Sequence, residues 1–430
     1  MTNPHISPKF RAFLWLWRLI LVLGMPAIIT YLWHRGRRDP DYFRHLRERF
    51  GIHKRRSDGH IWIHAVSLGE LRSAEPLIRS FLDDGYSIVT THFTPAGRRA
   101  AHASFPAEIA SGQLSAVWVP FDLALAFRGF FKAFRPQVGL VMEVEIWPGM
   151  IAACAARNIP LVLCNGQYPT RSFERDSKRF LSRRDFVSGF AGVLVKDAVQ
   201  ANRFSDLGQK CAAVTGEMRF EIQLRADHVK SAVAQRSLLA GRPTVTFASV
   251  VVGEDEVFIS SIKASGVRAV YVPRAPERFD ETFALLSEAG LRVMRRSTAL
   301  GPELDAPDSF ARDWDVLLGD SLGEMGYYLG LCDQAVIGGG FVPQGSHNII
   351  EALILRKPVI VGPYIWTIEF PVHAALSAGV ARQCTADDLH LALTDIPSPE
   401  QIEAFLAGQM GSVDKTRAAL ARFGIDLKPQ

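Results

Sequence analysis

The sequence predicts an α/β protein built from two Rossmann-like domains that face each other across a cleft. Three observations lead to this prediction. The chain has 430 residues, more than one ordinary hydrophobic core organises. From residue 61 onward, short apolar runs alternate with amphipathic stretches, a pattern typical of repeated βαβ units around a parallel sheet. The pattern occurs twice, and a polar segment over residues 222–243 separates the two sets.

Composition and charge limit the classes of protein to which the chain can belong. Hydrophobic residues make up 48% of the chain and charged residues 22%, which is typical of a globular protein. The formal net charge of +5 is mild, and no zinc-finger or RNA-binding motif accompanies it, so nucleic acid is not an expected partner. The five cysteines include no CxxC pair. Their spacing argues against a disulfide framework and favours a reducing compartment.

Residues 10–34 are predicted to form a membrane-associated helix. The run is strongly apolar, with Arg11 and Arg18 as its charged residues. Its uncharged part, 19–33, is short for a full span, which needs roughly 20 apolar residues. The sequence therefore leaves open whether the helix spans the bilayer or lies in its surface. A soluble amphipathic helix covering the N-terminal domain is the alternative. Aromatic residues that suit a membrane interface lie within the run: Trp15, Trp17, Tyr31 and Trp33.

A basic stretch follows the apolar run. Its members are Arg35, Arg37, Arg38, Arg44, Arg47, Arg49, Lys54, Arg55 and Arg56. A local basic cluster beside an apolar segment indicates anionic lipid more than a polynucleotide. The positive charge also favours a cytoplasmic location for everything downstream.

The first domain is expected over residues 36–222. Its predicted buried strands are 61–66, 87–93, 116–120, 138–143, 160–165 and 192–196. Helix-like stretches fall between them, for example 70–84 and 123–134. In the second of these helices a buried face is predicted by four phenylalanines at helical spacing: Phe127, Phe130, Phe131 and Phe134.

The second domain is expected over residues 240–400, followed by a C-terminal helical tail over 401–430. Its predicted strands are 244–249, 268–273, 292–296, 315–319, 334–339 and 358–362. Ligands in doubly wound folds bind outside the carboxyl ends of strands. The residues that follow each strand are therefore the candidates for chemistry.

The first candidate is the segment HAVSLGE, residues 64–70, which directly follows a strand. Ser67 and Gly69 predict a tight turn, and Glu70 would open the next helix. A carboxylate at this turn is well placed to act as general base for an acceptor hydroxyl. Alternatively, Glu70 is an acid that the helix dipole stabilises, and the pattern leaves both readings open.

The second candidate is MEVEIWPG, residues 142–149, at another strand end. Glu143 and Glu145 point the same way if the chain is still extended there. Two carboxylates on one side indicate hydroxyl recognition or pKa tuning. In the alternative, one carboxylate is solvated and the other pairs with an arginine.

The third candidate is a set of loops in the second domain. Arg274 ends a strand and is available for a phosphate. The segment GDSLGEMG, 319–326, is a glycine-rich loop that leads into a helix and suits an anion. The segment 338–352 combines a glycine run with Asn348 and Glu351. Glu351 could hold ribose hydroxyls, and Asn348 could cap the helix or hold a phosphate.

These segments also carry a family resemblance. HAVSLGE, ExEIWP, PR-PERF, GDSLGEM and the GGGF-GSHN-IEA block followed by P-VIVGP resemble, in the same order, the motifs of 3-deoxy-D-manno-octulosonic acid (Kdo) transferases, from about Gly36 to Val380. The resemblance implies a GT-B-type fold. It implies an inverting glycosyltransferase that moves Kdo from CMP-Kdo to a lipid A precursor in lipopolysaccharide core biosynthesis. The location implied is the cytoplasmic face of the inner membrane.

The resemblance also implies roles for residues. By motif match Glu70 is the catalytic base, and Glu143 and Arg219 align with positions that stabilise the transition state. The implied CMP site contains Pro273, Arg274, Gly323, Glu324, Met325, Asn348, Ile349, Ile350 and Glu351. The implied displacement needs no metal or other cofactor. The sequence does not predict an oligomeric state.

The chain departs from the family pattern in several loops. The family usually has Lys where Arg219 stands and His where Ala275 stands. The motif S-T-H-E-G-E-E is replaced by SVVVGEDE over 249–256, and a double glycine before His-Asn is Gly345-Ser346 here. The motif N-A-R-L-S appears as NGQYP, which places Gln167 where the family has an arginine.

These departures keep two other functions open. One is a transferase or epimerase that uses another nucleotide sugar, with UDP in place of CMP. The other is a catalytically altered paralogue that binds a lipid or a partner protein. The retained Glu70 argues against the second.

Overall fold

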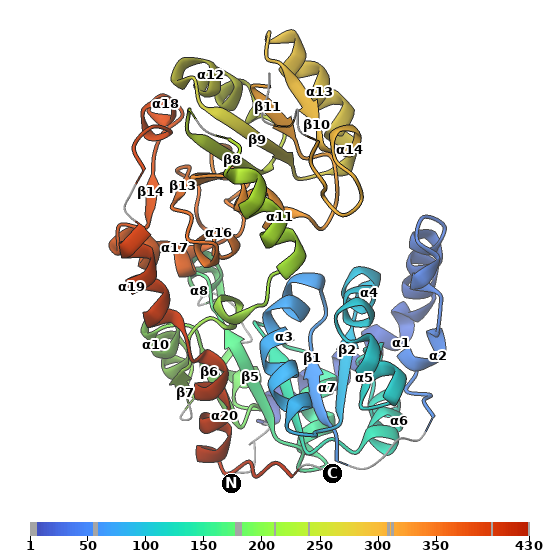
Figure 1. Cartoon of the computed structure of the whole chain (residues 1–430). Coiled ribbons are helices and arrows are strands. Elements are labelled where there is room, and N and C mark those ends of the chain that lie inside the picture. The colour runs from blue at the N-terminus through green and yellow to red at the C-terminus, as the bar shows by residue number, and fades with distance from the viewer. Residues whose placement is uncertain are drawn as a thin grey trace. The chain divides into compact units, whose positions relative to one another are not determined.

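The computed structural model describes residues 7–54, 59–176, 183–209, 212–239, 241–307, 310, 314–396 and 399–428. The chain forms two compact units (Figure 1). Unit 1 contains Met1–Ile222 and Gly411–Gln430, and unit 2 contains Gln223–Met410.

Unit 1 is built on a seven-stranded parallel sheet of order β3-β2-β1-β4-β5-β6-β7. The strands are β1 Ile61–His64, β2 Ile88–His92, β3 Leu114–Trp118, β4 Val138–Met142, β5 Leu161–Gly166, β6 Gly192–Val195 and β7 Ala212–Val214. The strand order reverses between β1 and β4, where His64 pairs with Val141. Such a switch point is where Rossmann-like sheets place their ligands.

Helices cover both faces of this sheet. They are α1 Pro8–Gly36, η1 Pro40–Tyr42, α2 Leu46–Arg49, α3 Leu68–Asp83, α4 Pro95–Ser104, α5 Pro106–Ser111, α6 Ala124–Phe134, α7 Pro148–Ala155, α8 Thr170–Asp176, α9 Arg183–Val187, α10 Ala198–Asp206, η2 Met218–Glu221 and α20 Ser412–Arg422. Successive strand residues face opposite sides. Ile61 and Ile63 therefore pack with α3 and α20, whereas Trp62 packs with α6 and α7. The predicted phenylalanine face of α6 is buried in this second layer.

Helix α1 packs its N-terminal part on unit 1. Phe10 is buried and meets Phe186 of α9 edge-on, with ring centroids 5.3 Å apart. The Nε1–H of Trp17 donates to Oδ2 of Asp122 at 2.8 Å. Arg18 is half-buried, and its charge acts on Asp122, so this arginine is accommodated by protein.

The outward side of α1 is apolar. Eight of its large apolar side chains are more than half exposed: Trp15, Leu16, Leu19, Ile20, Val22, Leu23, Tyr31 and Trp33. The helix is long and apolar enough to cross a membrane, with a mean hydropathy of 2.0 in its most apolar window. Both the covered and the exposed sides are thus apolar, which differs from a soluble amphipathic helix.

The basic stretch after α1 is used in part within the protein. Arg49 is buried, with its guanidinium 4.2 Å from the centroid of the Trp118 ring. Its Nη2 donates to the carbonyl of Phe93 at 3.1 Å. Arg49 is therefore not available to lipid, and Arg55 and Arg56 lie outside the described residues.

Unit 2 has a second seven-stranded parallel sheet, of order β10-β11-β9-β8-β12-β13-β14. The strands are β8 Thr244–Val250, β9 Arg268–Pro273, β10 Val293–Arg295, β11 Val316–Leu318, β12 Gln334–Ile337, β13 Val359–Val361 and β14 Ala381–Gln383. The helical elements are α11 Ala226–Arg236, α12 Asp255–Ser265, η3 Pro276–Arg278, α13 Phe279–Glu288, α14 Arg296–Ala299, α15 Met325–Gly330, α16 Ile350–Ile354, α17 Glu369–Ser377, α18 Leu389–Ala392 and α19 Pro399–Gln409. The prediction of two Rossmann-like α/β domains is confirmed.

The ends of unit 2 differ from the predicted domain limits. Helix α11, which precedes residue 240, packs in unit 2, because Ala232 is buried in the same cluster as Tyr327 and Leu331. The expected tail over 401–430 is divided. Helix α19 belongs to unit 2, whereas α20 returns to unit 1, where the hydroxyl of Tyr86 donates to the carbonyl of Leu427 at 3.2 Å.

Candidate active site

Glu70 lies in the first turn of α3, at the carboxyl end of β1. Ser67 caps this helix. Its Oγ accepts the Glu70 N–H at 3.3 Å, and its hydroxyl donates to Oε1 of Glu70 at 3.2 Å. The Val66 N–H donates to Oε2 of Glu70 at 2.6 Å. This is a variant of the capping box. Glu70 therefore stands at the start of the helix, as both readings of the sequence require.

The surroundings of Glu70 raise the pKa of its carboxyl group. Its side chain is 8% exposed. Burial raises the pKa of Glu70 to about 8, and the charges of Glu145 and Glu143 add to this effect, against the opposing hydrogen bonds from Val66 and Ser67. A carboxylate with a pKa near the working pH combines basicity with a useful ionised fraction. The cap fixes the carboxylate, and its surroundings make it basic.

The segment after β4 turns at once. Glu143 has φ +56°, a left-handed conformation that is uncommon outside glycine. Its N–H donates to the carbonyl of Cys164 at 2.9 Å, and Oε2 of Glu145 accepts the indole N–H of Trp147 at 2.6 Å. The extended geometry considered for Glu143 and Glu145 is therefore absent. Both charges nevertheless act on Glu70, so the switch point between β1 and β4 gathers three carboxylates.

His64 is buried next to this site, at the end of β1. Its ring is fully buried, and Nδ1 is hydrogen-bonded to Oγ1 of Thr91 at 2.9 Å. Burial lowers the pKa of His64 to about 3, so the imidazole is neutral. The ring meets the Trp147 ring edge-on, with centroids 5.5 Å apart. His64 therefore packs under the Glu145–Trp147 segment and does not compete with Glu70 as a base.

Arg219 lies in a buried ionic cluster on the same edge of the sheet. Its Nη2 is 2.9 Å from Oε2 of Glu217, which is also 2.8 Å from Nζ of Lys196. The amide of Asn165, at the end of β5, donates to Oε1 of Glu217 at 2.9 Å. Burial alone would raise the pKa of Glu217, but the charges of Arg219 and Lys196 hold it well below its usual value. Lys196 and Glu217 were not among the predicted site residues.

In unit 2, Arg274 and His347 lie close together at the edge of the sheet. Arg274 follows β9, and its N–H donates to the carbonyl of Val250 at 2.8 Å. Its side chain is exposed. Burial lowers the pKa of His347, and the charge of Arg274 lowers it further. The charge of Arg274 thus reaches the segment of His347 and Asn348.

The glycine loop after β12 requires glycine for steric reasons. Gly339 has φ +85°, and a Cβ there would lie 2.5 Å from the carbonyl oxygen of Gly345. Glu254, which sequence reasoning did not assign, holds this loop. Its Oε1 accepts the N–H groups of Gly339 at 2.7 Å and Phe341 at 3.1 Å. Its Oε2 accepts the Val251 N–H at 3.1 Å. One buried carboxylate therefore joins the ends of β8 and β12.

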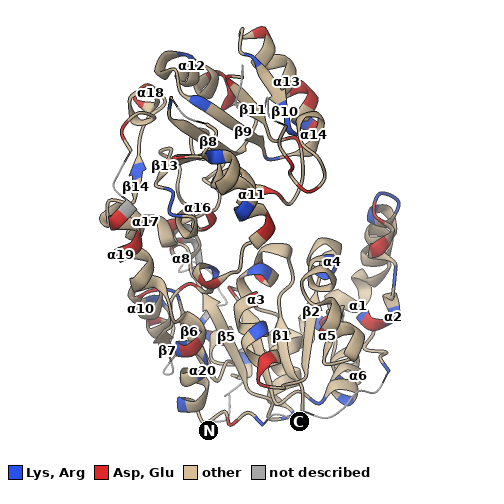
Figure 2. Ribbon diagram, viewed as in Figure 1, with Lys and Arg blue, Asp and Glu red and all other residues tan. Residues whose placement is uncertain are grey.

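The remaining predicted residues of unit 2 differ in their structural roles. Oδ1 of Asn348 accepts the Ile350 N–H at 3.0 Å and so caps α16, whose first turn carries Glu351. Met325 begins α15, directly after Gly323 and Glu324. Glu324 is held inside unit 2 by Arg296, with N–O distances of 2.6 Å from both Nε and Nη2. Figure 2 shows such acidic and basic residues interspersed within each unit.

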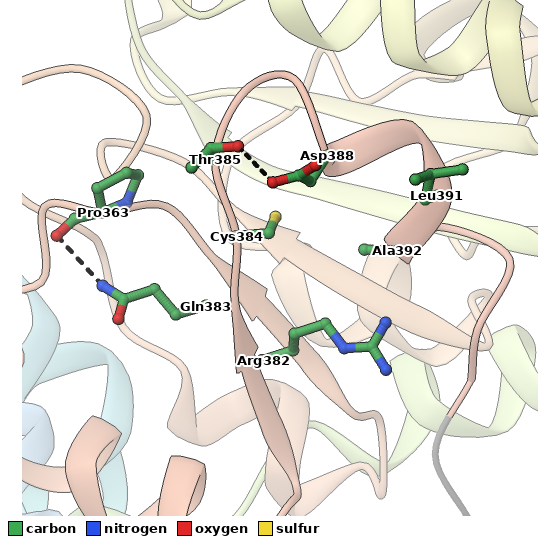
Figure 3. A pocket seen from close by; sticks show the side chains of 8 residues that line it. All are labelled: Pro363, Arg382, Gln383, Cys384, Thr385, Asp388, Leu391 and Ala392. Atoms are coloured by element: carbon green, nitrogen blue, oxygen red, sulfur yellow. Dashed lines mark hydrogen bonds between the residues drawn. The ribbon is translucent and has the colours of Figure 1, made fainter.

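Two hollows of the surface lie away from these residues. The first, about 540 Å³, lies at the end of β14. It is lined by Pro363, Arg382, Gln383, Cys384, Thr385, Asp388, Leu391 and Ala392 (Figure 3). The second, about 640 Å³, lies between α4 and the segment Asp41–Glu48. Neither is lined by a predicted site residue, so the strand-end geometry and not the hollows defines the site. Among the described residues, no group of three or more His, Cys, Asp or Glu is arranged to hold a metal ion.

Comparison with known proteins identifies the family. Residues 44–222 match the family model of 3-deoxy-D-manno-octulosonic-acid transferase (kdotransferase). The chain is 34% identical over 425 residues to the 3-deoxy-D-manno-octulosonic acid transferase of Bordetella pertussis, covering 92% of this chain and 96% of that protein. It is 30% identical over 373 residues to the transferase of the same name in Haemophilus influenzae, covering 83% and 84%.

A solved structure supports the fold. A glycosyltransferase from Rickettsia africae superposes with a TM-score of 0.55 at 10% identity, covering 86% of this chain and 99% of that one. At this identity the likeness concerns the two-domain fold alone. The relatives of Bordetella and Haemophilus establish the family: the chain belongs to the 3-deoxy-D-manno-octulosonic acid transferases.

Proposed function

We propose that this chain is an inverting glycosyltransferase that moves Kdo from CMP-Kdo to a lipid A precursor, in lipopolysaccharide core biosynthesis. The observation that carries the proposal is the setting of Glu70. A buried carboxylate with a raised pKa stands at the switch point of a Rossmann-like sheet. In this family that position suits the base that activates an acceptor hydroxyl.

The proposed reaction is a single displacement. Glu70 removes the proton from a hydroxyl of the acceptor, and the oxygen bonds to the anomeric carbon as its bond to the CMP phosphate breaks. Oε2 of Glu70 is held by the Val66 N–H at 2.6 Å, whereas Oε1 meets the rotatable Ser67 hydroxyl at 3.2 Å. We therefore assign proton removal to Oε1. Glu143 and Glu145 keep Glu70 basic.

Unit 2 is proposed to bind the donor. Arg274 suits the departing phosphate, because its exposed guanidinium stands at a strand end. The backbone of the glycine loop held by Glu254, and the start of α16 near Asn348 and Glu351, suit the rest of CMP. Glu324 acts through Arg296 on the shape of its loop. Arg219 of unit 1 suits an anionic group of a substrate, such as the Kdo carboxylate. The scheme uses no metal ion.

The apolar outer side of α1 supports contact with a membrane, which we propose is the inner membrane at its cytoplasmic face. Its exposed tryptophan and leucine side chains suit the boundary between lipid headgroups and acyl chains. The N-terminal part of α1 packs on unit 1, so the membrane surface would lie against this unit. A lipid-linked acceptor is thereby presented to the protein.

The test is product formation by the detergent-solubilised chain. Tetra-acylated lipid A precursor and CMP-Kdo, made in situ, are incubated with wild type, Glu70→Gln and Glu75→Gln, and product mass is followed. Glu75 is the matched control, because it is a part-buried carboxyl on the same helix whose pKa burial also raises. We expect one or more Kdo units to be added by wild type and Glu75→Gln and not by Glu70→Gln.

Folded wild-type protein that forms no product beside a working reference enzyme would overturn the proposal. A panel of UDP-sugars then tests whether the chain uses another donor.

A further inference from the structure

We propose that Lys196 is a positioning residue for Arg219, and that it supplies the positive charge that the family motif places at Gln167. The inference rests on the proposed function. It concerns a lysine that the motif comparison did not single out and that the structure places within the ionic cluster of unit 1.

Lys196 directly follows β6, and its side chain is fully buried. Its Nζ lies 2.8 Å from Oε2 of Glu217 and donates to Oε1 of Gln167 at 3.0 Å. A lysine is rarely buried without a partner of this kind. Both contacts are therefore needed to hold the ammonium in place.

Glu217 transmits the position of Lys196 to Arg219. Lys196 and Arg219 meet the same oxygen, Oε2, at 2.8 and 2.9 Å. The other oxygen accepts the Asn165 amide at 2.9 Å and the Arg219 N–H at 3.2 Å. With these donors around it, the carboxylate has little freedom to turn. Lys196 thus occupies the buried side of Oε2.

The exposed fractions of the three side chains show which of them reaches the surface. Those of Lys196 and Glu217 are 0% exposed, whereas that of Arg219 is 21% exposed. Two like charges on one oxygen repel each other. The buried ammonium therefore favours an outward guanidinium. Without the ammonium, Glu217 would draw Arg219 inward, away from a ligand.

The position of Gln167 explains why the charge comes from Lys196. Gln167 follows β5, and β5 and β6 are neighbours in the sheet. An arginine at 167 would carry its charge to the region that the Lys196 ammonium now occupies, because the two side chains already touch. The glutamine carries no charge and accepts the ammonium with its carbonyl oxygen. By this inference the positive charge is kept, but it lies on Lys196 after β6 instead of on residue 167 after β5.

Arg219 held outward binds an anionic group of a substrate. Two substrates carry such groups: the donor has the carboxylate of the transferred sugar, and the lipid A precursor has phosphates. Both are recognised by the same guanidinium chemistry. The experiment separates them through the two KM values.

The variants are Lys196→Gln, Lys196→Arg, the double variant Gln167→Arg/Lys196→Gln, and Lys357→Gln as a control. Lys357 is a half-buried lysine of unit 2 whose Nζ donates to the carbonyl of Cys332 at 2.6 Å. For Lys196→Gln we expect kcat/KM to fall about tenfold to a hundredfold, as for a misplaced binding group. The double variant and Lys196→Arg should recover most of the loss.

The KM that rises identifies the anion. A higher KM for CMP-Kdo assigns Arg219 to an anionic group of the donor, and a higher KM for the lipid assigns it to an acceptor phosphate. An active wild type with a Lys196→Gln variant equally active overturns the inference and leaves the proposed function standing. A double variant that folds but is no better than Lys196→Gln also overturns it. If Lys196→Gln does not fold, kcat/KM of the double variant is compared with that of wild type instead. A double variant that folds but is inactive then overturns the inference.

Discussion

Oε2 of Glu70 accepts the backbone N–H of Val66 at 2.6 Å. This contact fixes the carboxylate at the turn between β1 and α3. The bonds that cap the helix also orient the proposed base. The cap lowers the pKa of Glu70, but burial and the charges of Glu145 and Glu143 raise it by more.

Replacing Glu70 by Gln keeps a hydrogen-bond acceptor for Val66 and removes the base. We expect kcat to fall by roughly 10²–10⁴, the usual contribution of a general base, with smaller changes in KM. Single-turnover product formation by mass measures this. Glu75→Gln should stay within about twofold of wild type, since Glu75 is bonded to Ser104 away from the switch point. Equal losses in both variants would contradict a specific role for Glu70.

The activity should depend on pH through Glu70. Because the pKa of Glu70 is raised to about 8, the ionised base accumulates only as the pH approaches and passes that value. We expect kcat/KM to rise tenfold per pH unit below about pH 8 and to level off above it. Glu145→Gln removes a negative charge that raises this pKa, so its profile should move to lower pH. A Glu145→Gln profile that coincides with that of wild type would contradict this coupling.

The same shift predicts a pH-dependent stability cost. The pKa of Glu70 is about 4.5 before the influence of the fold and about 8 within it. Between these values the unfolded chain has released a proton that the folded chain retains, so the free energy of unfolding falls as pH rises. Below about pH 4.5 both states hold the proton and the cost is absent.

Glu70→Gln lacks this titration. Its melting temperature should therefore gain on that of wild type between pH 5 and pH 8.5, with a stability difference on the order of a few kcal/mol, at about 1.4 kcal/mol per pKa unit. Other groups titrate alike in both proteins and cancel. A difference in melting temperature between the two proteins that stays constant over this pH range would be the contrary result.

The sequence predicts the fold well where burial makes strands apolar. The twelve strands expected from apolar runs all form. Two strands were not predicted, β7 (Ala212–Val214) and β14 (Ala381–Gln383), which lie at sheet edges. Each has three residues, and most of these are partly exposed. In β14 only Ala381 is apolar, and in β7 the apolar run is made of two alanines and a valine. Runs this short and this small give periodicity little to detect.

The site divides in a similar way. Glu70 is predictable, because it follows a strand and a tight turn at Ser67 and Gly69, all within one short segment of the sequence. Lys196 and Glu254 are not, because their partners are distant in the chain. Glu254 bonds to Gly339 across 85 positions, and this pairing depends on β8 and β12 being neighbours. A local pattern cannot contain that information.

Glu254 should control the shape of the glycine loop. Glu254→Gln replaces one acceptor oxygen by an amide donor, which faces the N–H of Val251 or those of Gly339 and Phe341. We expect the unfolding free energy to fall by about 1–3 kcal/mol, the usual consequence of an unpaired buried donor. The KM for CMP-Kdo should rise, because this loop borders the proposed donor site. Glu256→Gln, an exposed change two residues away, is the control in melting and kinetic assays. An unaltered donor KM in Glu254→Gln would separate the loop from donor binding.

The exposed side of α1 should bind lipid. Leu19 and Leu23 lie one turn apart and are 55% and 72% exposed, so replacing both by Glu leaves the packing of Phe10 and Trp17 on unit 1 in place. Burying a leucine contributes about 1.5–3 kcal/mol. Losing two should therefore reduce partitioning into anionic vesicles by more than about tenfold, measured by flotation, at unchanged melting temperature. Leu391→Glu, an equally exposed leucine of unit 2, should float like wild type.

A Leu19→Glu/Leu23→Glu variant that floats like wild type would place membrane attachment on another surface. Retained turnover of a detergent-dispersed acceptor by the same variant would show that α1 delivers the protein to the lipid and is not needed for the chemistry at Glu70.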